Sequence, residues 1–299
     1  MYQRNNLRKI NQIIKPFLKA ELEGLTVYSL YNVSQLLKLE LDPFIRLDYF
    51  NAKLPSGFPD HPHRGFETVT YIKSGIFLYE DLQGNKANLG AGELQWIIAG
   101  KGIVHAEIPA SYTENTVGFQ FWFNVDSKNK MCDPLYQRFS SQQIPLVESK
   151  GAHVKILTGE SLGKKGIAQT KNQAIFLDVS LDQNAHFNQL IPKEFQGMAF
   201  VYEGSAFFGE NKINVELNQG ALIEIQDQEI LQVIAGEQGT KFILFAAKPI
   251  REAIYGQSPF VLDSQKNLDQ AYEDYQQGKN GFEGAQEWKS EIQQLILKK

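Results

Sequence analysis

The chain has 299 residues, of which 42% are hydrophobic and 21% charged, with a formal net charge of -4. This composition is typical of a folded globular protein and excludes an extensively disordered or fibrous one, and the length favours two domains. The slightly acidic balance lacks the basic stripe that binds a phosphate backbone, so we expect no direct nucleic-acid binding.

The N-terminal segment, residues 1–24, is basic, but Asn, Gln, Lys and Glu interrupt its apolar residues before a signal-peptide core could form. We therefore expect no export signal. No run approaches the roughly 18 to 20 apolar residues of a membrane-spanning helix. Cys132 is the only cysteine, which excludes an internal disulfide and favours a reducing compartment. Together these features predict a cytoplasmic protein that does not enter a membrane.

Residues 25–125 run in short segments rich in Val, Ile, Tyr and Phe, separated by Gly, Pro and Asn. This is an all-β pattern. Within residues 119–124, phenylalanine alternates with Gln120, Trp122 and Asn124. A period of two predicts a strand with one face, that of the phenylalanines, packed inward. Closing such strands into a barrel removes the exposed sheet edges.

A weak internal repeat follows. Residues 200–225 echo residues 69–97, with Tyr202 in the place of Tyr71, an offset of about 131 residues. Repeats of a solenoid are only about 20 to 50 residues long, so this offset predicts two similar domains.

The predicted domains are 1–145, an N-terminal metal-binding barrel, and 146–299, a second barrel followed by helices. After about residue 263 the chain becomes rich in Gln, Glu and Lys. Apolar residues there recur at helical spacing and predict two C-terminal helices. Examples are Trp288, Ile292 and Leu295.

Three of the five histidines cluster in two short motifs, HPHRGFE and GKGIVHAE. Alternate residues of a strand point to the same side, so His61 and His63 can present two imidazoles to one point. His105 and Glu107 can do the same from another strand. Imidazole and carboxylate together suit first-row transition metals. These four residues are therefore candidate metal ligands.

Spacing alone leaves the fourth ligand open between two glutamates. Glu67 shares the parity of His61 and His63 and could face the same way, unless a bulge at Gly65 redirects it. The remaining histidines, His153 and His186, have no partner at strand spacing, and we expect them not to bind metal.

Several segments resemble the cupin superfamily and, over almost the whole chain, its pirin family: GFPDHPHRGFETV, LQWIIAGKGIVHAE, FLDVSLD, SPFV and NGFEGAQEWKS. The resemblance implies two stacked cupin β-barrels, a bicupin, with short C-terminal helices. It also implies an iron in the N-terminal barrel held by His61, His63, His105 and Glu107. Glu67 then has a structural or supporting role.

The implied metal is Fe(II), although this donor set would also hold Mn, Ni, Cu, Co or Zn. The second barrel aligns Pro192 and Glu194 with the first two histidines, which implies a metal-free copy. Tyr79 stands where some pirins carry a histidine.

The resemblance further implies quercetin 2,3-dioxygenase activity, in which a flavonol is opened with O2 and carbon monoxide is released. Glu107, if it loosens from the metal, is the candidate general base for the flavonol hydroxyl, while the histidines only hold the ion. Two alternatives stay open. One is a non-enzymatic, redox-sensing transcription cofactor with a protein partner, and the other is a metal-dependent enzyme for another substrate.

Residues around the motifs have competing interpretations. Asp60 and Arg64 could orient ligands, pair with each other or be solvated. Trp96, Phe121 and Trp122 could form an aromatic wall for a flat substrate, but packing inside a barrel is the favoured interpretation.

Overall fold

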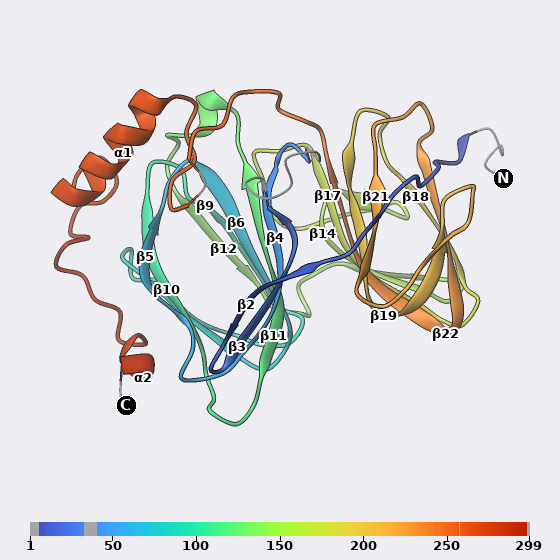
Figure 1. The fold of residues 1–299 in the computed structure, drawn as a ribbon, viewed down its shortest axis with the longest axis horizontal. Coiled ribbons are helices and arrows are strands. Elements are labelled where there is room, and N and C mark those ends of the chain that lie inside the picture. The colour runs from blue at the N-terminus through green and yellow to red at the C-terminus, as the bar shows by residue number, and fades with distance from the viewer. Residues whose placement is uncertain (1–5, 33–40, 257, 298–299) are drawn as a thin grey trace. The chain divides into compact units, whose positions relative to one another are not determined.

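A computed structural model of the chain describes residues 6–32, 41–256 and 258–297 (Figure 1). Within these residues most of the chain lies in antiparallel strands, and the helices are short. The predicted all-β fold with short C-terminal helices is confirmed. None of the helices that the structure describes has the length and apolar character needed to cross a membrane.

The described chain divides into two compact units. The first, here called the N-terminal barrel, comprises residues 17–141 and those from Ile250 onward. The second, the C-terminal barrel, comprises residues 142–249 and the described residues up to Pro16. This division differs from the predicted domains at both ends of the chain, because each terminal segment belongs to the barrel that is more distant in sequence.

Two antiparallel sheets form the N-terminal barrel. In the described residues the larger sheet has the strand order β12-β9-β6-β11-β4-β3-β2, and the smaller has the order β5-β10-β7-β8. The bounds are β2 (Phe17–Leu22), β3 (Leu25–Asn32), β4 (Phe44–Ala52), β5 (Phe58–His63), β6 (Phe66–Ser74), β7 (Phe77–Asp81), β8 (Lys86–Leu89), β9 (Leu94–Ile98), β10 (Ile103–Pro109), β11 (Thr116–Asn124) and β12 (Leu135–Phe139), with a 3-10 turn η2 (Ser127–Asn129).

The C-terminal barrel has one large sheet in the order β1-β21-β19-β22-β17-β14-β13, with β18 beside β22 and β20 beside β19, and a separate hairpin β15-β16. Its aliphatic and phenylalanine side chains form a single buried cluster. The bounds are β1 (Ile13–Ile14), β13 (Leu146–Ser149), β14 (Ala152–Thr158), β15 (Glu160–Ser161), β16 (Lys164–Lys165), β17 (Ala174–Leu181), β18 (His186–Leu190), β19 (Gln196–Phe208), β20 (Ile213–Val215), β21 (Gln219–Ile223) and β22 (Ile230–Ala247).

The N-terminal segment joins the C-terminal barrel through specific contacts. The strand β1 pairs with β21, and Arg8 donates from Nη2 to the carbonyl of Ile191 at 3.0 Å. A buried guanidinium needs such acceptors, and here the C-terminal barrel supplies them. No local pattern in the sequence predicts that β1 pairs with β21.

The strand predicted at residues 119–124 is β11, but its orientation differs from the prediction. Gln120 and Trp122 face a pocket between the two sheets of the N-terminal barrel. The phenylalanines point to the opposite face, where they are also buried, and Phe119 packs 5.1 Å from the ring of Tyr49. Both faces of this strand are covered, so an apolar alternation does not reveal which face lines the pocket.

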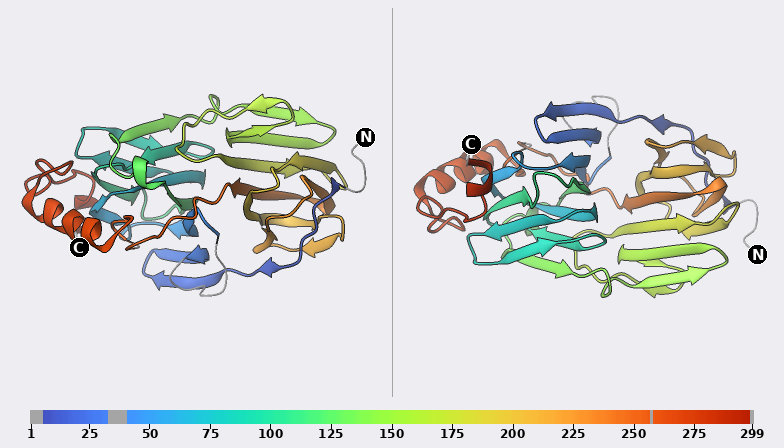
Figure 2. Two further views of the ribbon diagram at one scale, coloured as in Figure 1. Left: turned by 90° about the horizontal axis from the view of Figure 1, so that it is seen from above. Right: turned by 90° about the horizontal axis from the view of Figure 1, so that it is seen from below.

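One of the two predicted C-terminal helices forms as expected. The helix α1 (Gln265–Gln277) begins at Ser264, whose side chain accepts a hydrogen bond from the backbone N–H of Asn267, and ends at Gly278 in the left-handed conformation. Figures 1 and 2 show α1 outside the strands β5 and β10.

The second predicted helix is reduced to α2 (Gln294–Leu297). The segment before it is held by tertiary contacts instead. The backbone N–H of Ser290 donates to Asp60 Oδ2 at 3.2 Å, and that of Glu291 donates to Glu80 Oε2 at 3.0 Å. These bonds fix the backbone against β5 and β7, which overrides the local helical pattern.

Arg64 ties the C-terminal segment to the barrel. Its Nη1 lies 2.8 Å from Asp274 Oδ2 on α1, and both side chains are at most 2% exposed. The other nitrogens donate to the carbonyls of Lys101 at 2.6 Å and Asn280 at 2.8 Å, and Cζ lies 4.6 Å from the ring centre of Phe282. Of the alternatives left open for Asp60 and Arg64, a pair with each other does not form, because each side chain finds its partner in the C-terminal segment.

We expect Asp274→Ala to lower the free energy of unfolding by about 3 to 5 kcal/mol, because it leaves the guanidinium of Arg64 buried without its counter-charge. Urea unfolding measures this change. Asp269→Ala, on the exposed side of α1, is the matched control and should change stability by less than about 0.5 kcal/mol. Equal effects of the two substitutions would contradict the stabilising role of the buried pair between Arg64 and Asp274.

The same pair should make stability depend on pH in acid. Burial acts to raise the pKa of Asp274, but hydrogen bonds from Arg64, Asn280 and Gln270 lower it below its ordinary value. A depressed carboxyl pKa adds stability that is complete above the unfolded value of about 3.9 and is lost as pH falls through the folded one. The stability difference between wild type and Asp274→Asn should therefore be constant from pH 5 to 7 and shrink below about pH 4, as measured by urea unfolding at each pH.

Candidate metal centre

The two histidine motifs lie on neighbouring strands. Strand β5 pairs antiparallel with β10, and His105 stands opposite His61. On its other edge β10 pairs with β7 without a register shift, so His105 and Glu107 keep the same direction. The register between β5 and β10 shifts after His105, where β5 contains Pro59. The predicted pairing of the two motifs is thus present in the sheet.

Three imidazoles converge inside the N-terminal barrel. The ring centres of His61 and His105 are 4.4 Å apart, and those of His63 and His105 are 4.9 Å apart. One nitrogen from each ring lies within 4.8 Å of the other two, and the Nε2 atoms of His61 and His105 are 3.0 Å apart. Two ring nitrogens at this distance share either a proton or a cation.

The surroundings keep these rings neutral. Nδ1 of His61 lies 2.8 Å from the carbonyl oxygen of Pro59, and an N–H there leaves the Nε2 lone pair directed at the cluster. Burial lowers the pKa of His61, and burial together with the neighbouring imidazoles lowers the pKa of His63 and His105 well below the ordinary value. Neutral imidazole is the form that binds a metal.

Glu107 faces the same pocket but lies outside the tight group of histidine nitrogens. Its Oε1 accepts hydrogen bonds from Thr70 Oγ1 at 2.9 Å and from Gln95 Nε2 at 3.3 Å. Burial raises the pKa of Glu107 to about 7, against the effect of these bonds and of the positive charge of Arg46. Oε2 receives no hydrogen bond from the residues that the structure describes, which leaves it available to a ligand.

Glu67, the competing fourth ligand, is fully buried in β6 and does not line the pocket. Its Oε2 accepts a hydrogen bond from Trp96 Nε1 at 2.7 Å. Trp96 in turn stacks on Phe123 at 5.4 Å. These contacts favour the structural role for Glu67 and the packing interpretation for Trp96.

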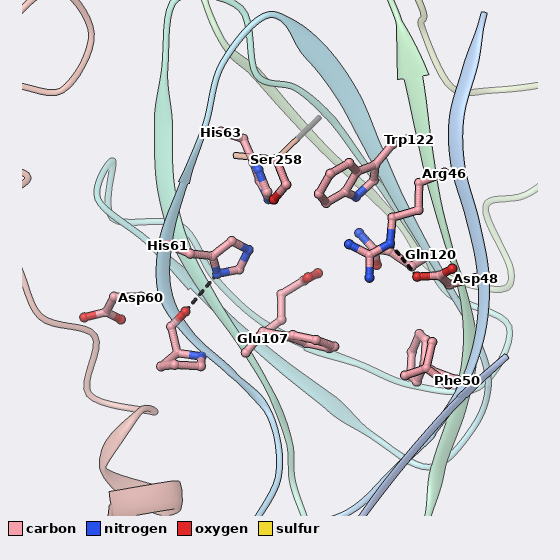
Figure 3. Close-up of a pocket in the computed structure, with 13 residues that line it drawn as sticks. Arg46, Asp48, Phe50, Asp60, His61, His63, Glu107, Gln120, Trp122 and Ser258 are labelled. Atoms are coloured by element: carbon pink, nitrogen blue, oxygen red, sulfur yellow. Dashed lines mark hydrogen bonds and ion pairs between the residues drawn. The ribbon is translucent and has the colours of Figure 1, made fainter. Parts of the chain in front are cut away.

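The opposite wall of the pocket contains residues that the sequence analysis did not select (Figure 3). The cavity holds about 280 Å³, and besides His61, His63 and Glu107 it is lined by Arg46, Asp48, Phe50, Phe58, Gln120 and Trp122, among others. Arg46 and Asp48 are two apart in an apolar strand, LDPFIRLDYF, and this charged pair on one strand face was the available signal. Trp122, interpreted as packing, also lines the pocket.

Tyr79 is buried behind the cluster. Its hydroxyl donates to Asp81 Oδ2 at 2.8 Å, and its ring lies 5.4 Å from that of His105 and stacks on Tyr136 at 5.1 Å. The ring therefore supports one side of His105. The other two histidines, His153 and His186, lie on β14 and β18 in the C-terminal barrel.

Comparison with known proteins agrees with this architecture. Residues 28–123 match the family described as Pirin, and residues 176–281 match the Pirin C-terminal cupin domain. The fold is thus that of a bicupin with a histidine-lined pocket in one barrel. The chain belongs to the pirin family.

Its relatives share most of their length with this chain. A Pirin-like protein of Solanum lycopersicum is 40% identical over 250 residues, which cover 84% of this chain and 86% of the relative. Pirin of Homo sapiens is 37% identical over 254 residues, covering 84% and 87%. A crystal structure of quercetin 2,3-dioxygenase from Acinetobacter baumannii has a TM-score of 0.81 at 26% identity, over 92% of this chain and 98% of that one.

The donor set fits a divalent transition metal. One nitrogen from each of His61, His63 and His105 lies within 4.8 Å of the other two, so the three imidazoles are gathered around a single point. The nearby carboxylate of Glu107 has one oxygen held and one oxygen available. Imidazole nitrogens with a single carboxylate suit Fe, Mn, Ni, Cu, Co or Zn and not the all-oxygen preference of Mg or Ca.

We expect wild-type protein reconstituted with Fe(II) to retain about one equivalent after dialysis, measured by plasma mass spectrometry. Each of His61→Ala, His63→Ala and His105→Ala should weaken metal binding by more than about tenfold, since loss of even an outer partner costs 10- to 100-fold. The control is His186→Ala, an exposed histidine of the C-terminal barrel, which should retain the wild-type content. Full retention by His105→Ala would exclude this cluster as the metal site.

Proposed function

We propose that the protein is a metal-dependent dioxygenase that opens a flavonol such as quercetin with O2 and releases carbon monoxide. The observation that carries the proposal is the cluster of His61, His63 and His105 beside a pocket that His61, His63 and Glu107 line. The similarity to a structure named quercetin 2,3-dioxygenase supports the choice of reaction. Family membership by itself defines a cupin-type protein and leaves the reaction open.

In this proposal the three histidines and Glu107 hold Fe(II). When bound, such a metal supplies a Lewis acid and a template for an oxygen-bearing substrate. The histidines keep their lone pairs directed at the site because burial disfavours their protonated form.

Glu107 is the proposed general base if its carboxylate loosens from the metal. Thr70 and Gln95 hold its Oε1, so the carboxylate has a fixed orientation with Oε2 on the side of the pocket. A carboxylate oxygen within hydrogen-bond reach of the flavonol 3-hydroxyl takes its proton, which leaves the electron-rich anion that reacts with O2.

The aromatic wall supports binding of a flat molecule. Phe50, Phe58 and Trp122 line the pocket and offer faces and edges for ring stacking. The cavity of about 280 Å³ lies just below the roughly 300 to 1,000 Å³ typical of small-molecule sites. A flavonol therefore fits with one part inside and extends through the mouth.

Iron-loaded wild-type protein should consume quercetin in air with release of carbon monoxide, followed by absorbance and by gas analysis. His61→Ala should abolish turnover because it removes a ligand, and Glu107→Ala should lower kcat/KM by about 10²-fold or more because it removes the base. His186→Ala should behave as wild type. No turnover by fully metallated wild type would refute the proposed reaction and favour the non-enzymatic, redox-sensing role with a protein partner.

A further inference from the structure

A charged cluster stands on the pocket wall opposite His61 (Figure 3). Arg46 and Asp48 lie two residues apart on β4 and so share one face of the strand. Asp48 Oδ2 accepts from Arg46 Nε and also from Lys19 Nζ, at 2.9 Å for the lysine. None of these three residues belongs to the proposed metal ligands.

This cluster carries more positive than negative charge. Two cationic side chains share the single carboxylate of Asp48, which is only 2% exposed. In the described part of the chain Arg46 has no other carboxylate within ion-pair distance. Burial and the nearby positive charge of Arg46 lower the pKa of Lys19, a sign that the cluster is crowded with positive charge. Since arginine stays protonated, this cluster brings a net positive charge to one wall of a cavity that Glu107 and Asp60 also line.

The free end of Arg46 points into the pocket. Nε is bonded to Asp48, while neither Nη donates a hydrogen bond to any residue that the structure describes. The guanidinium lies over the ring of Trp122, with Cζ 4.8 Å from the ring centre, and this contact fixes its plane. Two parallel N–H groups at the end of a fixed guanidinium match the two oxygens of a carboxylate.

We propose that Arg46 is the anion-binding residue of this pocket and selects a small aromatic substrate that carries a carboxylate. The carboxylate accepts from both Nη groups, and the ring packs beside Trp122 and Phe50. A single aromatic ring with its carboxylate can be held within a cavity of about 280 Å³. The inference rests on the proposed function only in placing the substrate beside the candidate metal site, and the contact with Arg46 is a separate property of the chain.

The test uses benzoate and benzamide, which share shape and differ in charge, titrated into iron-loaded protein by calorimetry. Wild type should bind benzoate at least tenfold more tightly than benzamide. Since a metal can itself attract a carboxylate, the decisive quantity is how that preference changes in Arg46→Gln. We expect benzoate affinity to fall by about ten- to a hundredfold in this variant, with benzamide affinity unchanged.

Two further variants separate the contributions. Arg46→Lys keeps a charge but loses the paired donors, so it should retain only part of the preference. Arg138→Gln removes an exposed arginine that pairs with Glu93 outside the pocket and should bind both probes as wild type does. Iron content and thermal unfolding midpoint, measured for every variant, show whether the site remains intact.

Equal binding of the two probes by wild type, no binding of either, or an unchanged preference in Arg46→Gln would overturn the inference. Full preference in Arg46→Lys would also overturn the paired contact, because charge alone would then suffice. Quercetin turnover by the same preparations separates the two proposals. Absent turnover with an Arg46-dependent preference refutes only the proposed reaction, and normal turnover without that preference refutes only the anion site.

Discussion

The antiparallel pairing of β5 with β10 is the constraint on which the site depends. It places His61 opposite His105, and a shift of one residue in either strand would turn its ligands to the other face of the sheet. Strand β10 lies between β5 and β7 and is held on both edges. Its two site residues, His105 and Glu107, therefore have directions fixed by the regular ladder with β7. The irregular residues of the pairing lie in β5, near Pro59.

Strand β5 ends the four-stranded sheet and needs support of another kind. The C-terminal segment provides it on both sides of the histidine motif. Asp60 accepts hydrogen bonds from Ser290, and Arg64 forms the buried pair with Asp274. His61 and His63 lie between these two anchors. The segment from α1 onward thus supports the strand that carries the candidate metal ligands His61 and His63, although it contributes no candidate ligand itself.

The parts of the structure that follow from local pattern were predictable. A period of two paired His61 with His63 and His105 with Glu107, because strand geometry alone decides which side chains share a face. The partner of Arg64 could not be predicted from the sequence, because Asp274 is 210 residues away and no local rule links the two residues. The second C-terminal helix is shorter than predicted for the same reason, because hydrogen bonds to Asp60 and Glu80 hold the backbone before it in another conformation.

The missed wall of the pocket shows a different limit. Arg46 and Asp48 have the spacing of a solvated strand face, and an alternating pattern does not say whether that face meets water or a cavity. For β11 the error was the reverse. The phenylalanine face was predicted to point inward, but it is buried on the side away from the pocket. Which face is interior depends on how the two sheets close around Gln120 and Trp122, and that closure is a property of the whole barrel.

The two walls of the pocket favour the same kind of ligand for independent reasons. Three neutral imidazoles add no negative charge, so a divalent ion balanced by Glu107 alone remains positive. On the opposite wall Arg46 and Lys19 share only Asp48. Phe50, Phe58 and Trp122 lie among these charged groups, and such apolar walls concentrate their field in the cavity. Electrostatics therefore select an anion over a neutral molecule of the same shape. A flavonol meets this requirement only after it loses its hydroxyl proton, whereas a carboxylate meets it on entry.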